Sequence, residues 1–147
     1  MISETVQKLA FVILDEGRCK FNAPLGIISR VQAGKYEIAA VSSETGIPHV
    51  GDSYPLEAVY CREVVKSKRT VAITEIEGVS GMRLHPLYDA IPCEFYISSP
   101  ILVGSTVWGT LNYTSLERRD APFTDDEIRY NEAKAMMLAR AIAASLG

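Results

Sequence analysis

The sequence has few of the residues from which metal and disulfide sites are built. It contains two histidines, His49 and His85, and three cysteines, Cys19, Cys61 and Cys93, that form no CxxC pair. An odd number of widely separated cysteines predicts neither a disulfide framework nor a zinc site. We therefore expect no metal site, an exposed His49 in a loop, and reduced thiols buried in apolar surroundings.

Long apolar runs and a strong charge imbalance are also missing. No segment approaches the roughly 20 apolar residues that a membrane span requires, and the first residues lack the basic region of a signal peptide. The net charge of −3 gives no electrostatic reason to expect a nucleic acid or an anionic membrane as a partner. We expect a cytoplasmic protein, and a chain of 147 residues suits one domain over residues 1–147.

Sequence signatures of catalysis are absent as well. The chain has no GxSxG motif, no P-loop and no dinucleotide-binding fingerprint. The acidic run Asp125, Asp126 and Glu127 follows Thr124 directly, and this arrangement is typical of a capping box at the start of a helix. We therefore expect no catalytic residues.

The most informative stretch that is present is residues 96–115, YISSPILVGSTVWGTLNYTS. Two runs of alternating residues, rich in β-branched and aromatic side chains, flank Gly104-Ser105, and this pattern predicts an antiparallel hairpin. Bulky residues in both registers predict that both faces of the hairpin are covered, as in the centre of a sheet. The alternation places Trp108 on the same face as Thr110 and Asn112. Gly109 within the second strand indicates a bulge or a close approach by another group.

Helical and strand patterns flank this hairpin. Apolar spacing predicts a helix over residues 3–16, with Ser3 as its N-terminal cap and Gly17 as its C-terminal cap. We then expect a hairpin at 25–31 and 35–41, a loop at 42–55, a helix at 56–66, a strand at 71–76, an irregular segment with a short helix at 85–90, and a last helix ending near residue 145.

This order of elements predicts an α+β domain. We expect a central antiparallel sheet of five to six strands. The two terminal helices would pack together on one face of the sheet. The middle helix and the irregular segment would cover the other face.

Several short motifs, taken in order, resemble the GAF domain family, and most closely its members in bacterial sensor histidine kinases and diguanylate cyclases. The resemblance covers nearly the whole chain and rests on GDSYPL at 51–56, YC at 60–61, VAI at 71–73, HPLY at 85–88, YI at 96–97, SPI at 99–101 and WGTLNYTS at 108–115. It implies a GAF/PAS-like sheet, with terminal helices on one side and a ligand pocket on the other, under the irregular segment.

The resemblance also implies where a small-molecule ligand would bind. Carried onto this sequence, the pocket wall would consist of Tyr60, Cys61, Val64, Met82, His85, Tyr88, Tyr96 and Trp108. Apolar and aromatic walls with a few polar tips suit such a pocket. The alternative is that the same side chains complete a second small core. His85 would bind a ligand or merely cap a helix before Pro86.

The GAF subfamilies differ in motifs that this sequence can be tested against. Bilin-binding members carry a cysteine immediately before the pocket histidine, whereas Leu84 precedes His85 here, so we expect no covalent bilin. The Asn-Lys-x-x-x-Phe pattern of cyclic-nucleotide-binding members is missing. Members that reduce free methionine sulfoxide use clustered cysteines, and the surroundings of Cys19, Cys61 and Cys93 do not match theirs.

These comparisons lead to the expectation of a sensory or regulatory GAF domain without catalysis of its own. Its output domain would lie outside this chain. One alternative is a module that only dimerises, as a parallel homodimer through its alanine-rich terminal helices. The other is a redox enzyme such as a free methionine sulfoxide reductase.

Overall fold

Six strands form one antiparallel sheet within the part of the chain that the computed structural model describes, residues 2–44, 46, 48–56, 62–74, 94–117 and 119–146. The order across the sheet is β3-β2-β1-β6-β5-β4, so β1 and β6 are central. The strands are β1 (Leu25–Gln32), β2 (Lys35–Ser43), β3 (Ser53–Pro55), β4 (Val71–Ile73), β5 (Phe95–Val103) and β6 (Thr106–Ser115). The predicted α+β class and its antiparallel sheet are confirmed.

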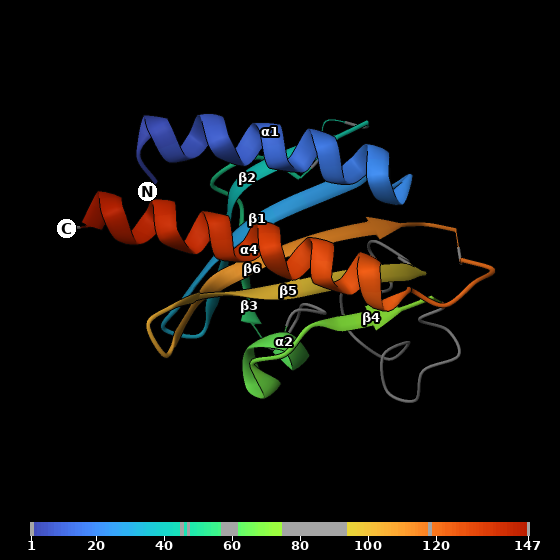
Figure 1. Ribbon diagram of the computed structural model, residues 1–147. Coiled ribbons are helices and arrows are strands. Elements are labelled where there is room, and N and C mark those ends of the chain that lie inside the picture. The colour runs from blue at the N-terminus through green and yellow to red at the C-terminus, as the bar shows by residue number, and fades with distance from the viewer. Residues whose placement is uncertain are drawn as a thin grey trace.

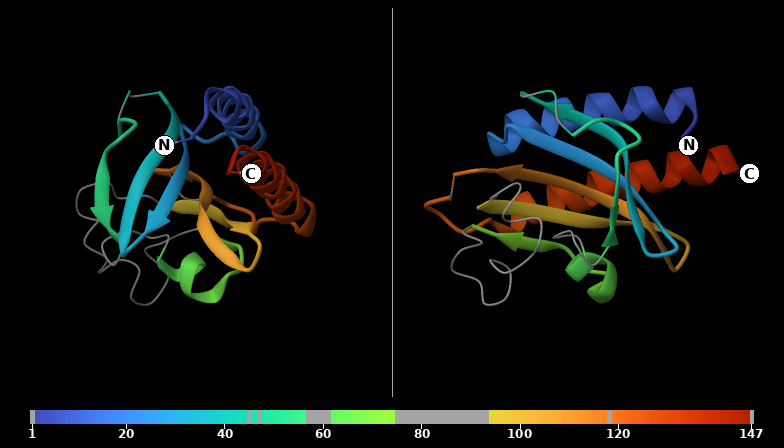
Figure 2. Two further views of the ribbon diagram at one scale, coloured as in Figure 1. Left: turned by 90° about the vertical axis from the view of Figure 1, so that its left-hand side faces the viewer. Right: turned by 180° about the vertical axis from the view of Figure 1, so that it is seen from behind.

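Two long helices pack side by side on one face of this sheet. They are α1 (Glu4–Phe21) and α4 (Asp125–Leu146) (Figure 1). A short helix, α2 (Arg62–Ser67), contacts β5 and β6. It lies apart from the two long helices α1 and α4 (Figure 2). The predicted pairing of the terminal helices on one sheet face is therefore confirmed.

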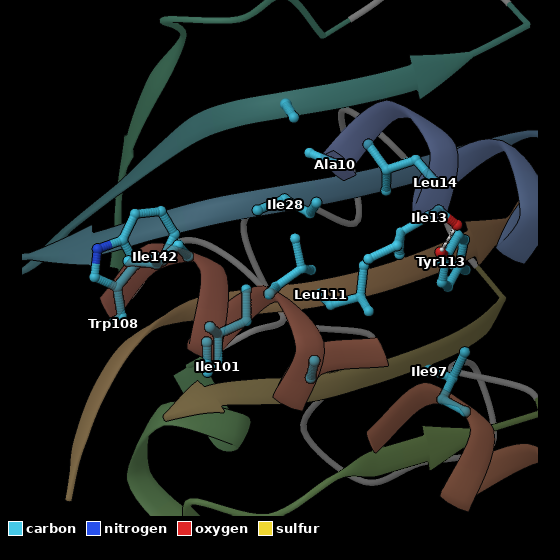
Figure 3. Close-up of a cluster of buried hydrophobic side chains, with 14 of the residues drawn as sticks. Ala10, Ile13, Leu14, Ile28, Ile97, Ile101, Trp108, Leu111, Tyr113 and Ile142 are labelled. Carbon is cyan, nitrogen blue, oxygen red and sulfur yellow. Dashed lines mark hydrogen bonds between the residues drawn. The ribbon is translucent and has the colours of Figure 1, made fainter. Parts of the chain in front are cut away.

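The main hydrophobic core lies between the two long helices and the sheet. Apolar spacing along each helix aligns one stripe with the sheet, as expected for an amphipathic surface helix. The stripe of α1 contributes Val6, Ala10 and Ile13, and that of α4 contributes Leu138 and Ile142, all of them buried. From the sheet, Ile28, Ile97, Ile101, Leu111 and Tyr113 complete the cluster (Figure 3).

The central hairpin of β5 and β6 forms as the alternation predicts, with one difference. Gly104 occupies the turn with a φ of 66°, and β6 is buried on both faces from Trp108 to Ser115. The register shifts after Ile101, which pairs with Gly109, whereas Leu102 pairs with Val107. Trp108 is the extra residue of this bulge, so it turns to the helix face, and the prediction that it shares a face with Asn112 is wrong.

Gly109 has no side chain because another strand passes too close to it. A Cβ placed there would lie 1.7 Å from the backbone oxygen of Ser29 on β1. The glycine thus marks both a close approach and the neighbourhood of a bulge, as the sequence predicts.

Helix α1 runs four residues past the predicted cap at Gly17, and that prediction is wrong. Asn22 forms the C-terminal cap instead, in the left-handed conformation with a φ of 52°. Gly17 faces the ring of Tyr113, whose hydroxyl oxygen would lie 2.0 Å from a Cβ at this position. The same hydroxyl donates a hydrogen bond of 2.9 Å to the backbone oxygen of Ile13 (Figure 3). Gly17 therefore makes room for a side chain and does not end the helix.

Three other boundaries differ from the prediction or cannot be compared with it. The segment predicted as a loop contains the short edge strand β3, which pairs with β2 through Tyr54 and Tyr36. Within the described residues, the middle helix begins at Arg62, and β4 ends at Ile73. The predicted short helix at residues 85–90 lies outside the described residues.

The predicted capping box starts α4. The Glu127 backbone N–H donates to Thr124 Oγ1 at 3.1 Å, and the Thr124 N–H donates back to Glu127 Oε1 at 2.9 Å. Arg119 adds a bidentate ion pair, with its Nη1 and Nη2 atoms 2.8 and 2.6 Å from the two carboxylate oxygens of Glu127. Burial tends to raise the pKa of Glu127, but the hydrogen bonds from Arg119 and Thr124 outweigh it, and the pKa is lowered.

We predict that Glu127 makes the fold sensitive to acid. A carboxylate with a lowered pKa in the folded state stabilises the fold above its unfolded pKa of about 4.3, and this stabilisation is lost as the pH falls through the folded pKa. The unfolding free energy of the wild type should therefore exceed that of Glu127→Gln near neutral pH, and the two should converge in acid. Urea titrations across this pH range would measure the difference. Glu4→Gln, which changes an exposed carboxylate, serves as the control. If the difference in unfolding free energy between the wild type and Glu127→Gln did not change with pH, the prediction would be contradicted.

Candidate functional site

A row of buried polar side chains lies on the sheet face opposite the two long helices. Asn112 stands between Leu111 and Tyr113, which both belong to the helix-side core. Because successive side chains of a strand alternate between faces, Asn112 projects from the opposite face. Ser29 follows the core residue Ile28 and projects in the same direction. The sheet thus separates an apolar face from a face with a polar centre.

Hydrogen bonds join these polar groups into a chain, here called the polar floor, which consists of Ser29, Tyr36, Thr110 and Asn112. The hydroxyl oxygens of Ser29 and Thr110 are 2.7 Å apart, and the Thr110 backbone N–H donates to the Ser29 hydroxyl at 3.0 Å. Asn112 Nδ2 donates to the Tyr36 hydroxyl at 3.1 Å and to Thr110 Oγ1 at 3.4 Å. None of the four residues is more than 4% exposed.

Apolar and aromatic side chains surround the polar floor. Ile27, Tyr36, Ile38 and Tyr96 form a second buried cluster, and Tyr54 packs against it from the edge strand β3. Burial first, and the nearby Asp52 carboxylate second, raise the pKa of Tyr54, so its phenol stays neutral near neutral pH. A few neutral hydrogen-bonding groups within an apolar frame are typical of a small-molecule site.

Three of the eight predicted pocket residues are described. Val64 on α2 and Tyr96 on β5 are fully buried. Tyr96 belongs to the second cluster, beside the polar floor, whereas Trp108 belongs to the helix-side core, next to Ile142 (Figure 3). Tyr96 and Trp108 therefore lie on opposite faces of the sheet and do not line one pocket.

The other five predicted pocket residues lie outside the described residues. They are Tyr60, Cys61, Met82, His85 and Tyr88. Their role stays a prediction, as does the burial of Cys61.

The polar floor itself is not among the pocket residues that the sequence predicts. A signal for it is present in β6, where Thr110, Asn112 and Thr114 alternate with apolar residues although both faces of the strand are buried. Small polar residues repeated on a covered strand face indicate buried hydrogen bonding. The partners Ser29 and Tyr36, on β1 and β2, follow only from the strand order and register.

A second polar chain anchors α4 to the sheet. Asn131 Nδ2 donates to Ser99 Oγ at 2.9 Å and to the Leu111 backbone oxygen at 3.3 Å. The Ser99 hydroxyl also bonds to Thr70 Oγ1 at 2.8 Å, and Thr70 donates to a Glu132 carboxylate oxygen at 2.8 Å. Asn131 is fully buried, and its Oδ1 has no hydrogen-bond partner in the described structure, an arrangement that costs stability.

The described residues contain no cluster of three or more histidine, cysteine or acidic side chains able to hold a metal ion. Neither α1, α2 nor α4 is long and apolar enough to cross a membrane. Cys19, near the end of α1, is exposed, contrary to the expected burial, and His49 is exposed as predicted.

A model of the GAF domain family matches residues 5–146. The chain therefore belongs to the GAF domain family. Among curated protein sequences no match was found.

Solved structures of other proteins have the same fold. The blue-light absorbing form of the PixJ GAF domain from Thermosynechococcus elongatus has a TM-score of 0.77 at 17% identity, covering 97% of this chain and 87% of that chain. The type II free methionine-R-sulfoxide reductase from Thermoplasma acidophilum has a TM-score of 0.77 at 15% identity, covering 96% and 94%. The GAF domain of a phosphoenolpyruvate-protein phosphotransferase from Coxiella burnetii has a TM-score of 0.77 at 13% identity, covering 98% and 86%.

Proposed function

We propose that this chain is a cytoplasmic sensory GAF domain that binds a small molecule non-covalently over the polar floor. It would regulate an output domain of a bacterial signalling protein, such as a histidine kinase or a diguanylate cyclase. The observation that carries the proposal is the hydrogen-bonded chain of Ser29, Thr110, Asn112 and Tyr36 within an apolar frame. A purely structural core does not need such a row, because apolar side chains can fill the same space without polar groups that must each find a partner.

Strand β6 offers a direct route from this site to both long helices. Asn112 belongs to the polar floor, whereas its neighbours Leu111 and Tyr113 bond to the helix side. The Leu111 oxygen accepts from Asn131 of α4, and the Tyr113 hydroxyl donates to Ile13 of α1. A ligand that moves β6 by a fraction of an ångström would therefore act on both helices, because packed cores shift between discrete arrangements.

The position of Cys19 favours binding over redox catalysis. Its exposed thiol is carried by α1, which lies on the opposite side of the sheet from the polar floor. A reductase mechanism needs cysteines next to the bound substrate, and Cys19 does not meet that requirement. Chemistry by Cys61 and Cys93 belongs to the alternative enzyme proposal, and labelling of their thiols in the native state would test it.

We predict that a ligand for the polar floor stabilises the wild-type protein and not the Asn112→Leu variant. At about 100 times its Kd, a ligand that binds only the folded state adds about 2.7 kcal/mol to the unfolding free energy. Each kcal/mol raises the Tm by roughly 2–4 °C for a chain of this size. A thermal-shift screen with cyclic nucleotides, tetrapyrroles and amino acids, run on both proteins, measures the effect.

The control for this screen is Ser99→Ala. Ser99 and its neighbour Ser98 are both fully buried. Ser99 accepts a hydrogen bond from Asn131 on the helix side of the sheet, away from the polar floor. This variant should lose stability and keep the full ligand-induced shift. A screen in which no ligand stabilises the wild type more than Asn112→Leu would refute binding at the polar floor.

The outer surface of the two long helices favours a second role, dimerisation. Phe11 and Val12 on α1 are 43% and 54% exposed, and Met136 and Met137 on α4 are 56% and 43% exposed. Exposed apolar side chains gathered on one layer are typical of a protein interface. Of the alanines of α4, Ala135 and Ala139 face the core, so they do not contribute to this surface.

We predict a parallel homodimer through this helical layer. Light scattering at high micromolar concentration should give twice the chain mass for the wild type and the monomer mass for the double variant Met136→Lys and Met137→Lys. Leu116→Lys changes an equally exposed apolar residue outside the helices and should leave the dimer intact. A monomer mass for the wild type would contradict the prediction.

A further inference from the structure

A cavity of about 530 Å³ opens on the helix side of the sheet, away from the polar floor. It lies between the start of α1 and the strands β1 and β2, and Trp108 on β6 forms part of its wall. Its walls include Ile2, Arg30, Glu37, Ala39, Val50 and Trp108. This volume falls within the range of about 300–1,000 Å³ that small-molecule sites occupy.

Two β-bulges shape this cavity. Between β1 and β2, Ile28 pairs with Ala40 and Ser29 with Ile38, which leaves Ala39 as an extra residue. Between β5 and β6 the extra residue is Trp108. Both extra residues line the cavity. Bulges re-aim side chains and are enriched beside functional sites.

Two opposite charges face the cavity without neutralising each other. Arg30 and Glu37 are direct cross-strand partners, which ordinarily attract. The Arg30 guanidinium instead lies 4.8 Å from the centre of the Trp108 ring, and its Nη2 donates to Gln32 at 3.4 Å. Among the described residues, neither Arg30 nor Glu37 forms an ion pair.

From this geometry we propose that the cavity binds a small zwitterion with an apolar body, such as an apolar amino acid. The guanidinium of Arg30 would hold its carboxylate, because arginine binds carboxylates in a planar, bidentate manner. The Glu37 carboxylate would hold its ammonium group. A simple anion would meet the carboxylates of Glu37 and Glu4, and a simple cation would meet Arg30. The apolar body contacts Ile2, Ala39 and Val50.

The tryptophan in the cavity wall provides the readout, since Trp108 is the only tryptophan of the chain. L-Phenylalanine is the probe, and phenylpropionate and phenethylamine are its analogues with one charge each. Excitation at the red edge of the tryptophan absorption avoids signal from phenylalanine and tyrosine. L-Phenylalanine should change the Trp108 emission saturably, and each analogue should bind at least about tenfold more weakly, since it leaves one protein charge unpaired.

Variants of the full chain distinguish the contribution of the two charges to binding from that of the cavity volume. Arg30→Gln and Glu37→Gln should each weaken the binding of L-phenylalanine by about tenfold. The variants are compared by the midpoint of the titration, because Arg30→Gln also alters the Trp108 emission. Ala39→Leu keeps both charges, fills the cavity and should abolish binding. Arg129→Gln, on the exposed surface of α4, is the control and should bind normally.

Either of two results would overturn the proposal. One is the absence of a saturable change in the wild type. The other is a change of equal midpoint in the wild type and in both charge variants, each shown to be folded by circular dichroism. Because this cavity and the polar floor lie on opposite sides of the sheet, Asn112→Leu should leave the response intact, and failure of one site is distinguishable from failure of the other.

Discussion

The contact between the Tyr113 side chain and α1 determines where the helical layer sits on the sheet. The Tyr113 ring occupies the space that two glycines leave, Gly17 on α1 and Gly26 on β1. Its hydroxyl bonds to the Ile13 backbone oxygen in the middle of the helix. Burial first, and then the nearby Tyr130, Glu16 and Asp15, raise the pKa of Tyr113 far above the usual value, so the hydroxyl keeps the proton that it donates.

With α1 held in this way, the two faces of the sheet differ in composition. The helix face is filled by one apolar core to which α4 adds its own anchor, Asn131. The other face carries the polar floor, with Asn112 only one residue from Tyr113. The same strand thus contributes to the candidate site and to the anchoring of both long helices. This alternation is the physical basis for the proposal that a ligand on one face changes the helices on the other.

The sequence predicts elements well where a local pattern decides the structure. The central hairpin, the caps at Ser3 and Thr124 and the apolar stripes of α1 and α4 depend on residues close together in the chain. Errors arise where a distant residue decides. Gly17 has the local appearance of a helix cap, but Tyr113, far away in the sequence, requires the missing side chain.

In the candidate site, too, local patterns in the sequence predict some features, whereas distant residues determine others. A bulge displaces Trp108 by one position and so reverses its face, and no period-two pattern reveals that shift. The polar floor joins Ser29 and Tyr36 to Thr110 and Asn112, residues brought together only by the order β2-β1-β6. Its existence is indicated by polar residues on a covered strand, but its partners depend on tertiary structure.

The most direct test of this account is a double-mutant cycle at Gly17 and Tyr113, measured by urea unfolding. In the wild type, Gly17→Ala should cost about 1–3 kcal/mol, because the new methyl group collides with the Tyr113 ring. In a Tyr113→Leu background the same change should stabilise the protein by up to about 1 kcal/mol, the ordinary helix preference of alanine over glycine. A Gly17→Ala effect of the same sign and size in both backgrounds would contradict the central role of Tyr113.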